Sequence, residues 1–234
     1  TNCELLMSAT IGDLDVYKCL IGAAEYKDND FCPIEVPSTF DFTKSPIYYS
    51  TRYKMSYREK ASSISHIVNK VIEICNKNND VKGIIHTGSY EIAQAFYNAI
   101  PNSIRYRVIN YNDSRDKRQA LQRFINSKNG ILVGPSLIEG LSFDYDLCRF
   151  NIFMKLPYAS LGDNLVKAKM RLFPDWYSLD VCSRLDQGIG RGVRAPDDWC
   201  TTYILDGCID NIINDKNQIR NLCKTTRERL IKMD

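Results

Sequence analysis

The sequence predicts an α/β fold in which a doubly wound, mainly parallel sheet carries helices on both faces. Short apolar runs bounded by turn residues alternate along the chain with longer segments whose apolar residues recur at helical spacing. The short runs are largely apolar rather than alternating, as expected for strands that are covered on both faces. Strands and helices that alternate in this way are typical of parallel sheets.

The expected strands share apolar residues and flanking glycine, proline or polar residues. They cover residues 46–49, 83–87, 105–109, 130–134, 150–154 and 202–206. Before the first of them, residues 11–46 are polar and are interrupted by glycine and proline, which predicts a short helix and then a connecting stretch. The run from Leu5 to Thr10 resembles a buried strand that ends in a loop. We therefore expect the chain to be a piece of a longer protein or a processed product.

The expected helices are recognised by apolar residues that recur every three or four positions. Residues 58–78 form the longest, and another begins after the loop at 88–90. A polar, mostly basic helix is expected at 214–234. The helix between the third and fourth strands has a cap candidate in Asp113 or Ser114. Its expected buried residues are Leu121, Phe124 and Ile125.

Composition indicates an ordinary globular protein, with 44% apolar and 25% charged residues. The net charge is 31 − 28 = +3, which does not by itself indicate a nucleic-acid-binding protein. The sequence contains neither an apolar run of about 18 residues nor a signal segment, so we expect no membrane contact and a cytoplasmic or nuclear, not secreted, location. Nine cysteines without a C-x-x-C pair favour reduced, mostly buried thiols, and no metal site is predicted.

The stretch from Gln187 to Arg194 combines three glycines with two arginines. Arg191 and Arg194 lie one turn apart if the stretch is helical, so both guanidinium groups can address one anion such as a triphosphate. An ordinary solvated helix end is the alternative reading. The glycines disfavour it, because each costs about 1 kcal/mol relative to alanine inside a helix.

A loop that would enclose the phosphates of a nucleotide is missing from this sequence. Gly83 and Gly88 have the spacing of the G-x-x-x-x-G-K-[ST] loop, but Ser89 stands where that loop needs lysine. Val193 likewise interrupts the G-x-G-x-x-G pattern of dinucleotide-binding proteins. Arginines suited to phosphoryl transfer without such a loop predict that the loop belongs to another domain.

Ligands of open parallel sheets bind beyond the carboxyl ends of the strands. The loops at Thr87–Tyr90, Gly134–Phe143 and Leu156–Asp163 each follow an expected strand, and the glycine-arginine stretch lies just before the last strand. The sequence therefore predicts that these segments meet at one edge of the sheet.

Four segments taken in order resemble helicase motifs III to VI of superfamily 2. They are Ser8-Ala9-Thr10, Thr87-Gly88-Ser89-Tyr90, Glu139-Gly140-Leu141-Ser142-Phe143 and Gln187-x-x-Gly190-Arg191-x-x-Arg194. Further segments resemble the DinG/XPD branch of these helicases, namely Ser38-Thr39-Phe40-Asp41, Lys155-Leu156-Pro157-Tyr158, Trp176-Tyr177 and Tyr203-Ile204-Leu205-Asp206. Two positions depart from the pattern: Ser142 stands where relatives commonly have Asp, and Gly207 stands where they commonly have Arg.

The resemblance implies a RecA-like fold and a two-part organisation. Residues 1–45 would hold the end of a first helicase domain with motif III and a connecting segment, and residues 46–234 would form the second RecA-like domain with motifs IV to VI. Members couple ATP hydrolysis to movement along single-stranded DNA. ATP and Mg²⁺ would be bound mainly by the N-terminal RecA-like domain of the same protein.

The resemblance also implies roles for nine residues. Arg191 and Arg194 would act as arginine fingers on the nucleotide, with Gln187 beside them. The remaining roles are nucleotide binding for Glu139, Gly140 and Gly190, and DNA binding for Thr87, Ser89 and Tyr90. Tyr90 has the alternative of packing its ring on the sheet edge. Two other functions stay open, namely a non-catalytic RecA-like module that binds nucleic acid or protein, and an RNA helicase or translocase.

Overall fold

One parallel sheet organises the structure, which is a computed structural model that describes residues 5–26, 30–111, 115–135, 137 and 142–233. Within these residues seven strands pair in the order β3-β4-β2-β5-β6-β1-β7, and every pair is parallel. The strands are β1 Ile47–Tyr49, β2 Gly83–His86, β3 Val108–Asn110, β4 Ile131–Gly134, β5 Phe150–Phe153, β6 Thr201–Ile204 and β7 Leu230–Lys232. The predicted parallel α/β architecture is confirmed.

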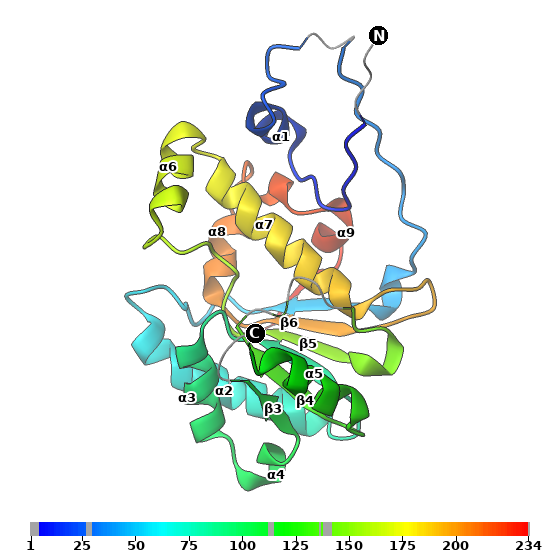
Figure 1. Ribbon diagram of the computed structural model, residues 1–234, viewed down its shortest axis with the longest axis vertical. Helices are drawn as coiled ribbons and strands as arrows, with labels where there is room; N and C mark the ends of the chain where they lie inside the picture. The colour runs from blue at the N-terminus through cyan, green and yellow to red at the C-terminus, as the bar shows by residue number, and fades with distance from the viewer. Residues whose placement is uncertain (1–4, 27–29, 112–114, 136, 138–141, 234) are drawn as a thin grey trace.

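Helices cover both faces of the sheet (Figure 1). Figure 1 shows α2, α3 and α4 on one side of β5 and β6, and α6 to α9 on the other. The helices are α1 Leu14–Leu20, α2 Lys60–Lys77, α3 Tyr90–Ala99, α4 Asn102–Arg105, α5 Lys117–Asn126, α6 Asn164–Leu172, α7 Trp176–Ile189, α8 Asp210–Ile213 and α9 Lys224–Arg227.

Alternation along each strand divides the core between the two faces. Ile85 of β2 and Ile152 of β5 pack with α2 and α3, in a cluster that contains Phe96. Phe153 points to the opposite face and packs with residues of α7. On that opposite face Ile84 packs with Phe124 of α5. Because the central strands are buried on both faces, their sequences are almost continuously apolar, which is the pattern that predicted them.

Local chemistry fixes the turn between β2 and α3. Gly88 has a φ of 71°, a left-handed conformation that glycine adopts without strain. Ser89 caps α3, because its hydroxyl oxygen accepts a hydrogen bond from the backbone nitrogen of Ile92 at 3.2 Å. Gly83 allows close packing under Phe150, whose ring atoms lie 2.2–2.4 Å from the place that a Cβ would occupy.

Several predicted elements are wrong in their type or bounds. The strand expected at 105–109 begins only at Val108, because residues 102–105 form the short helix α4 behind Pro101. Asp113 and Ser114, the predicted caps of the next helix, lie outside the described residues, and α5 begins at Lys117. On α5 Phe124 is buried as predicted, whereas Ile125 is 43% exposed and Leu121 only partly buried.

The two ends of the described chain also differ from prediction. Residues 214–234 do not form one helix, because they contain a 3-10 turn, the single turn of α9 and the edge strand β7. β7 pairs with β1, and the backbone nitrogen of Met233 donates to Tyr49 O at 2.8 Å. The predicted strand at Leu5–Thr10 is absent from the described residues, and Leu5 and Met7 are exposed.

Arg107 is buried and donates hydrogen bonds to four backbone carbonyls. Its Nε donates to Asn129 O at 2.8 Å and its Nη1 to Cys75 O at 3.0 Å. Its Nη2 donates to Asn78 O and to Val81 O, each at 2.8 Å. Cys75 and Asn78 lie at the C-terminal end of α2, where carbonyls lack helical partners. Arg107 therefore joins the end of α2 to the entries of β2 and β4.

The described cysteines are free, and five of them are buried. Burial raises the pKa of the Cys75 thiol and of the Cys182 thiol to about 12. These two thiols therefore stay protonated at neutral pH, and the prediction of mostly buried cysteines is confirmed for the described residues. In the same part of the chain, no helix has both the length and the apolar character needed to cross a membrane.

His86 ends β2 with its imidazole ring buried against Phe153, at 4.4 Å between ring centroids. Neither ring nitrogen has a hydrogen-bond partner at good geometry among the described residues. Burial lowers the pKa of His86 from 6.5 to about 3, and the neighbouring Asn151 amide offsets only part of this effect. His86 is therefore neutral in the folded protein over the range in which it becomes charged in the unfolded chain.

We expect acid to destabilise the fold through His86. Between pH 6.5 and pH 3 the unfolded chain binds a proton at His86 that the folded protein does not bind. The free energy of unfolding should therefore be flat above pH 6.5 and fall by about 1.4 kcal/mol per pH unit below it. Urea unfolding at pH 7.5, 6.5 and 5.5 measures this slope.

Two substitutions separate the two histidines of the chain in that measurement. His86→Phe keeps an aromatic ring on Phe153 and should remove most of the slope. His66 is exposed and stacks on Tyr53, so His66→Gln should leave the slope unchanged. An equal slope in wild type and His86→Phe would show that His86 does not cause the acid destabilisation.

Candidate functional site

The glycine-arginine stretch lies where α7 ends, close to the amino ends of β5 and β6. The side-chain nitrogen of Asn151, the second residue of β5, donates to Gly188 O at 3.1 Å. Gly192 packs against Cys200, which immediately precedes β6: a Cβ on Gly192 would lie 2.6 Å from the Cys200 sulfur. Glycine is therefore required at 192 so that the chain can pass this close to the strand entries.

The predicted meeting of all candidate segments at one edge is wrong. Thr87 and Leu156 follow the carboxyl ends of β2 and β5, whereas the glycine-arginine stretch lies at the opposite, amino edge. The reason is topological: a helix that joins two parallel strands must run back across the sheet, so its C-terminal end reaches the amino ends of the strands. In Figure 1, α7 crosses above β5 and β6 in this way.

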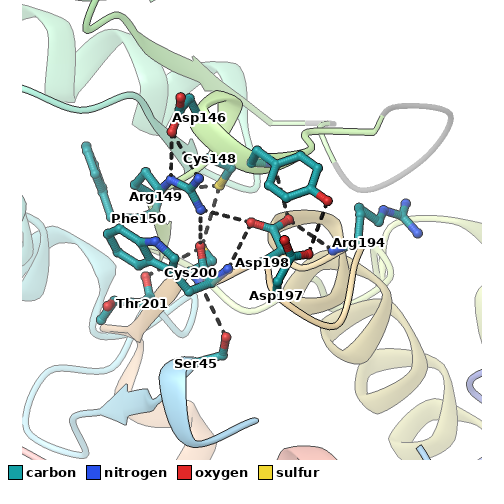
Figure 2. Close-up of polar contacts among 12 residues, drawn as sticks. Ser45, Asp146, Cys148, Arg149, Phe150, Arg194, Asp197, Asp198, Cys200 and Thr201 are labelled. Carbon is teal, nitrogen blue, oxygen red and sulfur yellow. Dashed lines mark hydrogen bonds and ion pairs between the residues drawn. The ribbon is translucent and has the colours of Figure 1, made fainter. Parts of the chain in front are cut away.

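The two arginines differ in their surroundings. Arg191 lies within the 3-10 turn Gly190–Gly192 that continues α7, and it is half-buried. Arg194 is exposed, but its backbone nitrogen donates to Asp198 Oδ2 at 3.1 Å. Figure 2 shows its guanidinium group directed away from that carboxylate. Gly190, predicted to bind nucleotide, ends α7, and among the described residues no atom beyond its neighbours and its own helix lies within 4 Å of the position that a Cβ would occupy.

The predicted motif III contacts the predicted motif VI helix. The amide nitrogen of Gln187 donates to Thr10 Oγ1 at 3.3 Å, and the Ser183 hydroxyl lies 3.3 Å from the same oxygen. Asp13, which caps α1, forms an ion pair at 2.9 Å with Arg220 of the 3-10 turn Ile219–Asn221, and α1 lies against α7. The structure therefore brings Thr10 to Gln187, although residues 5–10 do not form the expected strand.

At the carboxyl edge, the predicted nucleic-acid residues are engaged in local hydrogen bonds. Thr87 is buried, and its hydroxyl donates to Ser89 O at 3.0 Å. The Ser89 hydroxyl is occupied as the cap of α3. Tyr90 packs edge-on against Tyr111, at 6.1 Å between centroids, and remains 43% exposed. Both roles weighed for Tyr90, packing at the sheet edge and offering an exposed ring, are therefore compatible with its position.

A hollow of about 340 Å³ lies beside the Tyr90 ring. Its walls are formed by Tyr90, Glu91, Ala93, Gln94, Asn110 and Tyr111. Tyr90 and Gln94 come from α3, and Asn110 ends β3. The hollow therefore opens at the carboxyl edge, on the β3 side of the sheet.

Glu139 and Gly140, predicted to bind nucleotide, lie outside the described residues. The chain on either side of them connects the two edges: β4 ends at Gly134 at the carboxyl edge, and the chain re-enters the sheet through β5 at the amino edge. Phe143 is buried against Phe124 on the way. Ser142 donates a 2.6 Å hydrogen bond to Asp144, the residue that precedes the 3-10 turn Tyr145–Leu147.

The sequence did not predict the hydrogen bonds of two buried carboxylates, one beside the candidate site and one that holds loops together at the opposite edge. Asp198 pairs with Arg149 at 2.9 Å at the amino edge, next to Arg194 (Figure 2). Asp206 ends the last predicted strand at the carboxyl edge, where its oxygens accept from the backbone nitrogens of Met55, Leu156 and Cys208 at 2.9–3.0 Å. Asp206 belongs to the segment Tyr203–Asp206 that resembles the DinG/XPD branch, but that segment does not predict its hydrogen bonds to distant loops.

Comparisons with known proteins show which family the chain belongs to. The family of helicase C-terminal domains matches residues 71–226, which is two thirds of the chain. The ATP-dependent DNA helicase YoaA of Escherichia coli (strain K12) is 26% identical over 182 residues, covering 73% of this chain and 28% of that protein. The chain therefore spans little more than a quarter of this curated relative.

Solved XPD structures share the fold. The structure of S. tokodaii Xpd4 has a TM-score of 0.55 and 16% identity, over 82% of this chain and 39% of the other. A second structure, titled XPD helicase, has a TM-score of 0.59 and 17% identity, over 81% and 35% of the two chains. The sheet thus has the RecA-like α/β fold of XPD helicase domains. The chain belongs to the helicase C-terminal domain family, as a DinG/XPD-like member.

Proposed function

We propose that this chain is the second motor domain of an ATP-dependent DNA helicase, and that it supplies arginine fingers to a nucleotide held mainly by an N-terminal RecA-like domain. One observation supports this most strongly: Arg194 has its backbone fixed by a buried carboxylate while its guanidinium group stays exposed. A solvent-facing cation on a fixed backbone is suited to a ligand supplied from outside this domain.

The chain's own groups would act on the phosphates as charge-stabilising donors. Guanidinium groups offer paired N–H donors that match phosphoryl oxygens, and they strengthen as negative charge builds up during transfer. Gln187, whose side chain is hydrogen-bonded to Thr10, would lie beside these arginines. Mg²⁺ supplied with ATP would neutralise phosphate charge in the partner domain. Residues 1–45 fit the role of the connection to that domain, because Thr10 contacts the motif VI helix.

We place single-stranded DNA at the carboxyl edge. The hydroxyls of Thr87 and Ser89 are already engaged, so their part would be to shape the turn and present the backbone N–H groups at the start of α3 to a phosphate. The exposed ring of Tyr90 offers a surface on which a base can stack. Glu139 and Gly140 would belong to the segment that connects this edge with the nucleotide.

The test compares the full-length protein with this chain alone. The full-length protein should hydrolyse ATP faster in the presence of single-stranded DNA and separate DNA duplexes, whereas the chain alone should do neither. DNA-stimulated hydrolysis by the chain alone would contradict the proposed division between two domains. Separation of RNA but not DNA duplexes would assign an RNA helicase. Nucleic-acid binding without hydrolysis in the full-length protein would assign a non-catalytic module.

A further inference from the structure

Asp198 is a fully buried carboxylate that joins separate segments of the amino edge. It is 1% exposed, and each of its oxygens accepts two hydrogen bonds. Oδ1 accepts from Arg149 Nη1 at 2.9 Å and from the backbone nitrogen of Trp199 at 2.8 Å. Oδ2 accepts from the backbone nitrogens of Tyr145 and Arg194, each at 3.1 Å. All the acceptor positions of the carboxylate are therefore in use.

Arg149 keeps this buried carboxylate paired. Its guanidinium group is itself largely buried and donates from Nη1 to Trp199 O at 2.9 Å. Its other side donates to Asp146 Oδ1 from Nη2 at 2.9 Å and from Nε at 3.1 Å. The guanidinium carbon lies 4.7 Å from the centre of the Trp199 ring. A buried ion pair that is satisfied this completely fixes geometry more than it adds stability.

The two backbone groups that share Asp198 Oδ2 come from different parts of the site. Arg194 ends the glycine-arginine stretch, and Tyr145 belongs to the segment that leads from residues 142–144 into β5. Tyr145 has a φ of 50°, which a residue other than glycine adopts only where its surroundings impose it. Its hydroxyl also donates to Asp197 at 3.2 Å. Figure 2 shows Arg149 and Arg194 on either side of Asp198, with Asp197 beside it.

We propose that Asp198 is a positioning residue that sets where the Arg194 guanidinium is presented and ties that position to the segment at Tyr145. The inference rests on the proposed role of Arg194 in ATP hydrolysis. Without the carboxylate, residues 194–198 would lose the bond that closes their turn onto Tyr145, and the arginine would sample many positions. Misplacement by about 1 Å of a group that stabilises a transition state can cost on the order of 100-fold in rate.

The experiment is Asp198→Asn in the full-length protein. Asparagine keeps the size of the side chain but replaces one acceptor oxygen by an NH₂ group, which must face N–H donors on either side. The kcat of DNA-stimulated ATP hydrolysis should fall by about 10-fold to 100-fold. The KM for ATP and the affinity for single-stranded DNA should change less than about twofold, because binding groups elsewhere are intact.

A double variant distinguishes positioning from a general structural role. If Asp198 acts through Arg194, Asp198→Asn should lower kcat by less than about twofold when Arg194 is already alanine. If Asp198→Asn lowered kcat by the same factor in both backgrounds, the proposal would be overturned. Arg194→Ala alone tests the proposed function. Normal ATP turnover in Arg194→Ala would contradict the proposed role of this arginine. Low turnover in Arg194→Ala together with normal turnover in Asp198→Asn would contradict only the positioning role of Asp198.

Asp206→Asn is the matched control for loss of stability. Asp206 is equally buried and accepts three backbone hydrogen bonds, but it lies at the carboxyl edge. Its replacement should lower Tm while kcat, measured well below Tm, stays within about twofold of wild type. If Asp206→Asn reduced kcat as much as Asp198→Asn at the same loss of Tm, destabilisation would explain both and the positioning role would fall.

Discussion

Replacing Arg191 or Arg194 by alanine is expected to lower the DNA-stimulated ATP turnover of the full-length protein by about 10³-fold or more, the magnitude that arginine fingers contribute. The loss should appear in kcat, because the guanidinium groups act on charge that develops during phosphoryl transfer. Truncating Arg194 removes an exposed side chain, so the fold should be retained. Steady-state ATP hydrolysis with saturating single-stranded DNA, together with circular dichroism, measures both outcomes.

Two further variants sharpen this test. Arg194→Lys keeps the positive charge but loses the planar pair of donors, so it should recover only a small part of the turnover. Arg171 is also an exposed arginine, but it lies on α6 away from the glycine-arginine stretch, and Arg171→Ala should keep near-normal hydrolysis. Turnover near wild type in both Arg191→Ala and Arg194→Ala would remove the arginine-finger assignment.

Arg107→Met should lower the free energy of unfolding by about 3–5 kcal/mol. Methionine fills much of the same space, but four carbonyls at the end of α2 and the entries of β2 and β4 lose their donor. Hydrogen bonds from a charged donor contribute about 1.5–3 kcal/mol each, and their loss inside a buried cluster adds less than the full sum. Urea unfolding at neutral pH measures the loss.

Arg105, two residues before Arg107, offers a matched control. Its Nη2 reaches the carbonyls of Tyr97, Asn98 and Ile100 at 3.1–3.4 Å, but the side chain is only partly buried. Arg105→Met should therefore cost less than about 1 kcal/mol, as for other hydrogen bonds near the surface. Equal losses in the two variants would mean that burial of the Arg107 guanidinium is not what makes it important.

The central strands could be predicted because strands that are buried on both faces consist mainly of apolar residues. β2, β4 and β5 lie in the middle of the sheet and are buried at every position, so their sequences are apolar runs. β7 could not be found in this way. It is a three-residue edge strand whose Ile231 and Lys232 are exposed, and it forms because β1 offers its free edge.

Leu5 and Met7 show the reverse error. Their hydrophobicity predicted a buried strand, yet they are 73% and 83% exposed. Burial depends on a surface to pack against, and no described residue provides one for them. The sequence of a segment shows which apolar side chains could be buried, but their burial also requires a surface from another part of the protein.

The residues of the candidate site were partly predictable. Arg191, Arg194 and Gln187 stand in one short pattern, and their position at the end of a helix follows from local sequence. Asp198 and Arg149 are separated by 49 positions, and only pairing of β5 with β6 brings them together. Which edge carries the arginines follows from the direction of α7 between parallel strands, a consequence of topology that no single motif contains.

Because α7 runs across the sheet from the carboxyl edge to the amino edge, its two ends lie at the two edges where the proposed ligands would bind. Trp176 begins the helix on the side of the Leu156–Asp163 loop, and the arginines follow its other end. Fourteen residues of α-helix span about 21 Å, so a tilt of about 5° about one end moves the other by about 2 Å. Hydrogen bonds to a phosphate tolerate only a few tenths of an ångström. If single-stranded DNA binds at the carboxyl edge as proposed, a tilt of this size at that edge would move the arginines at the amino edge by more than a phosphate contact tolerates.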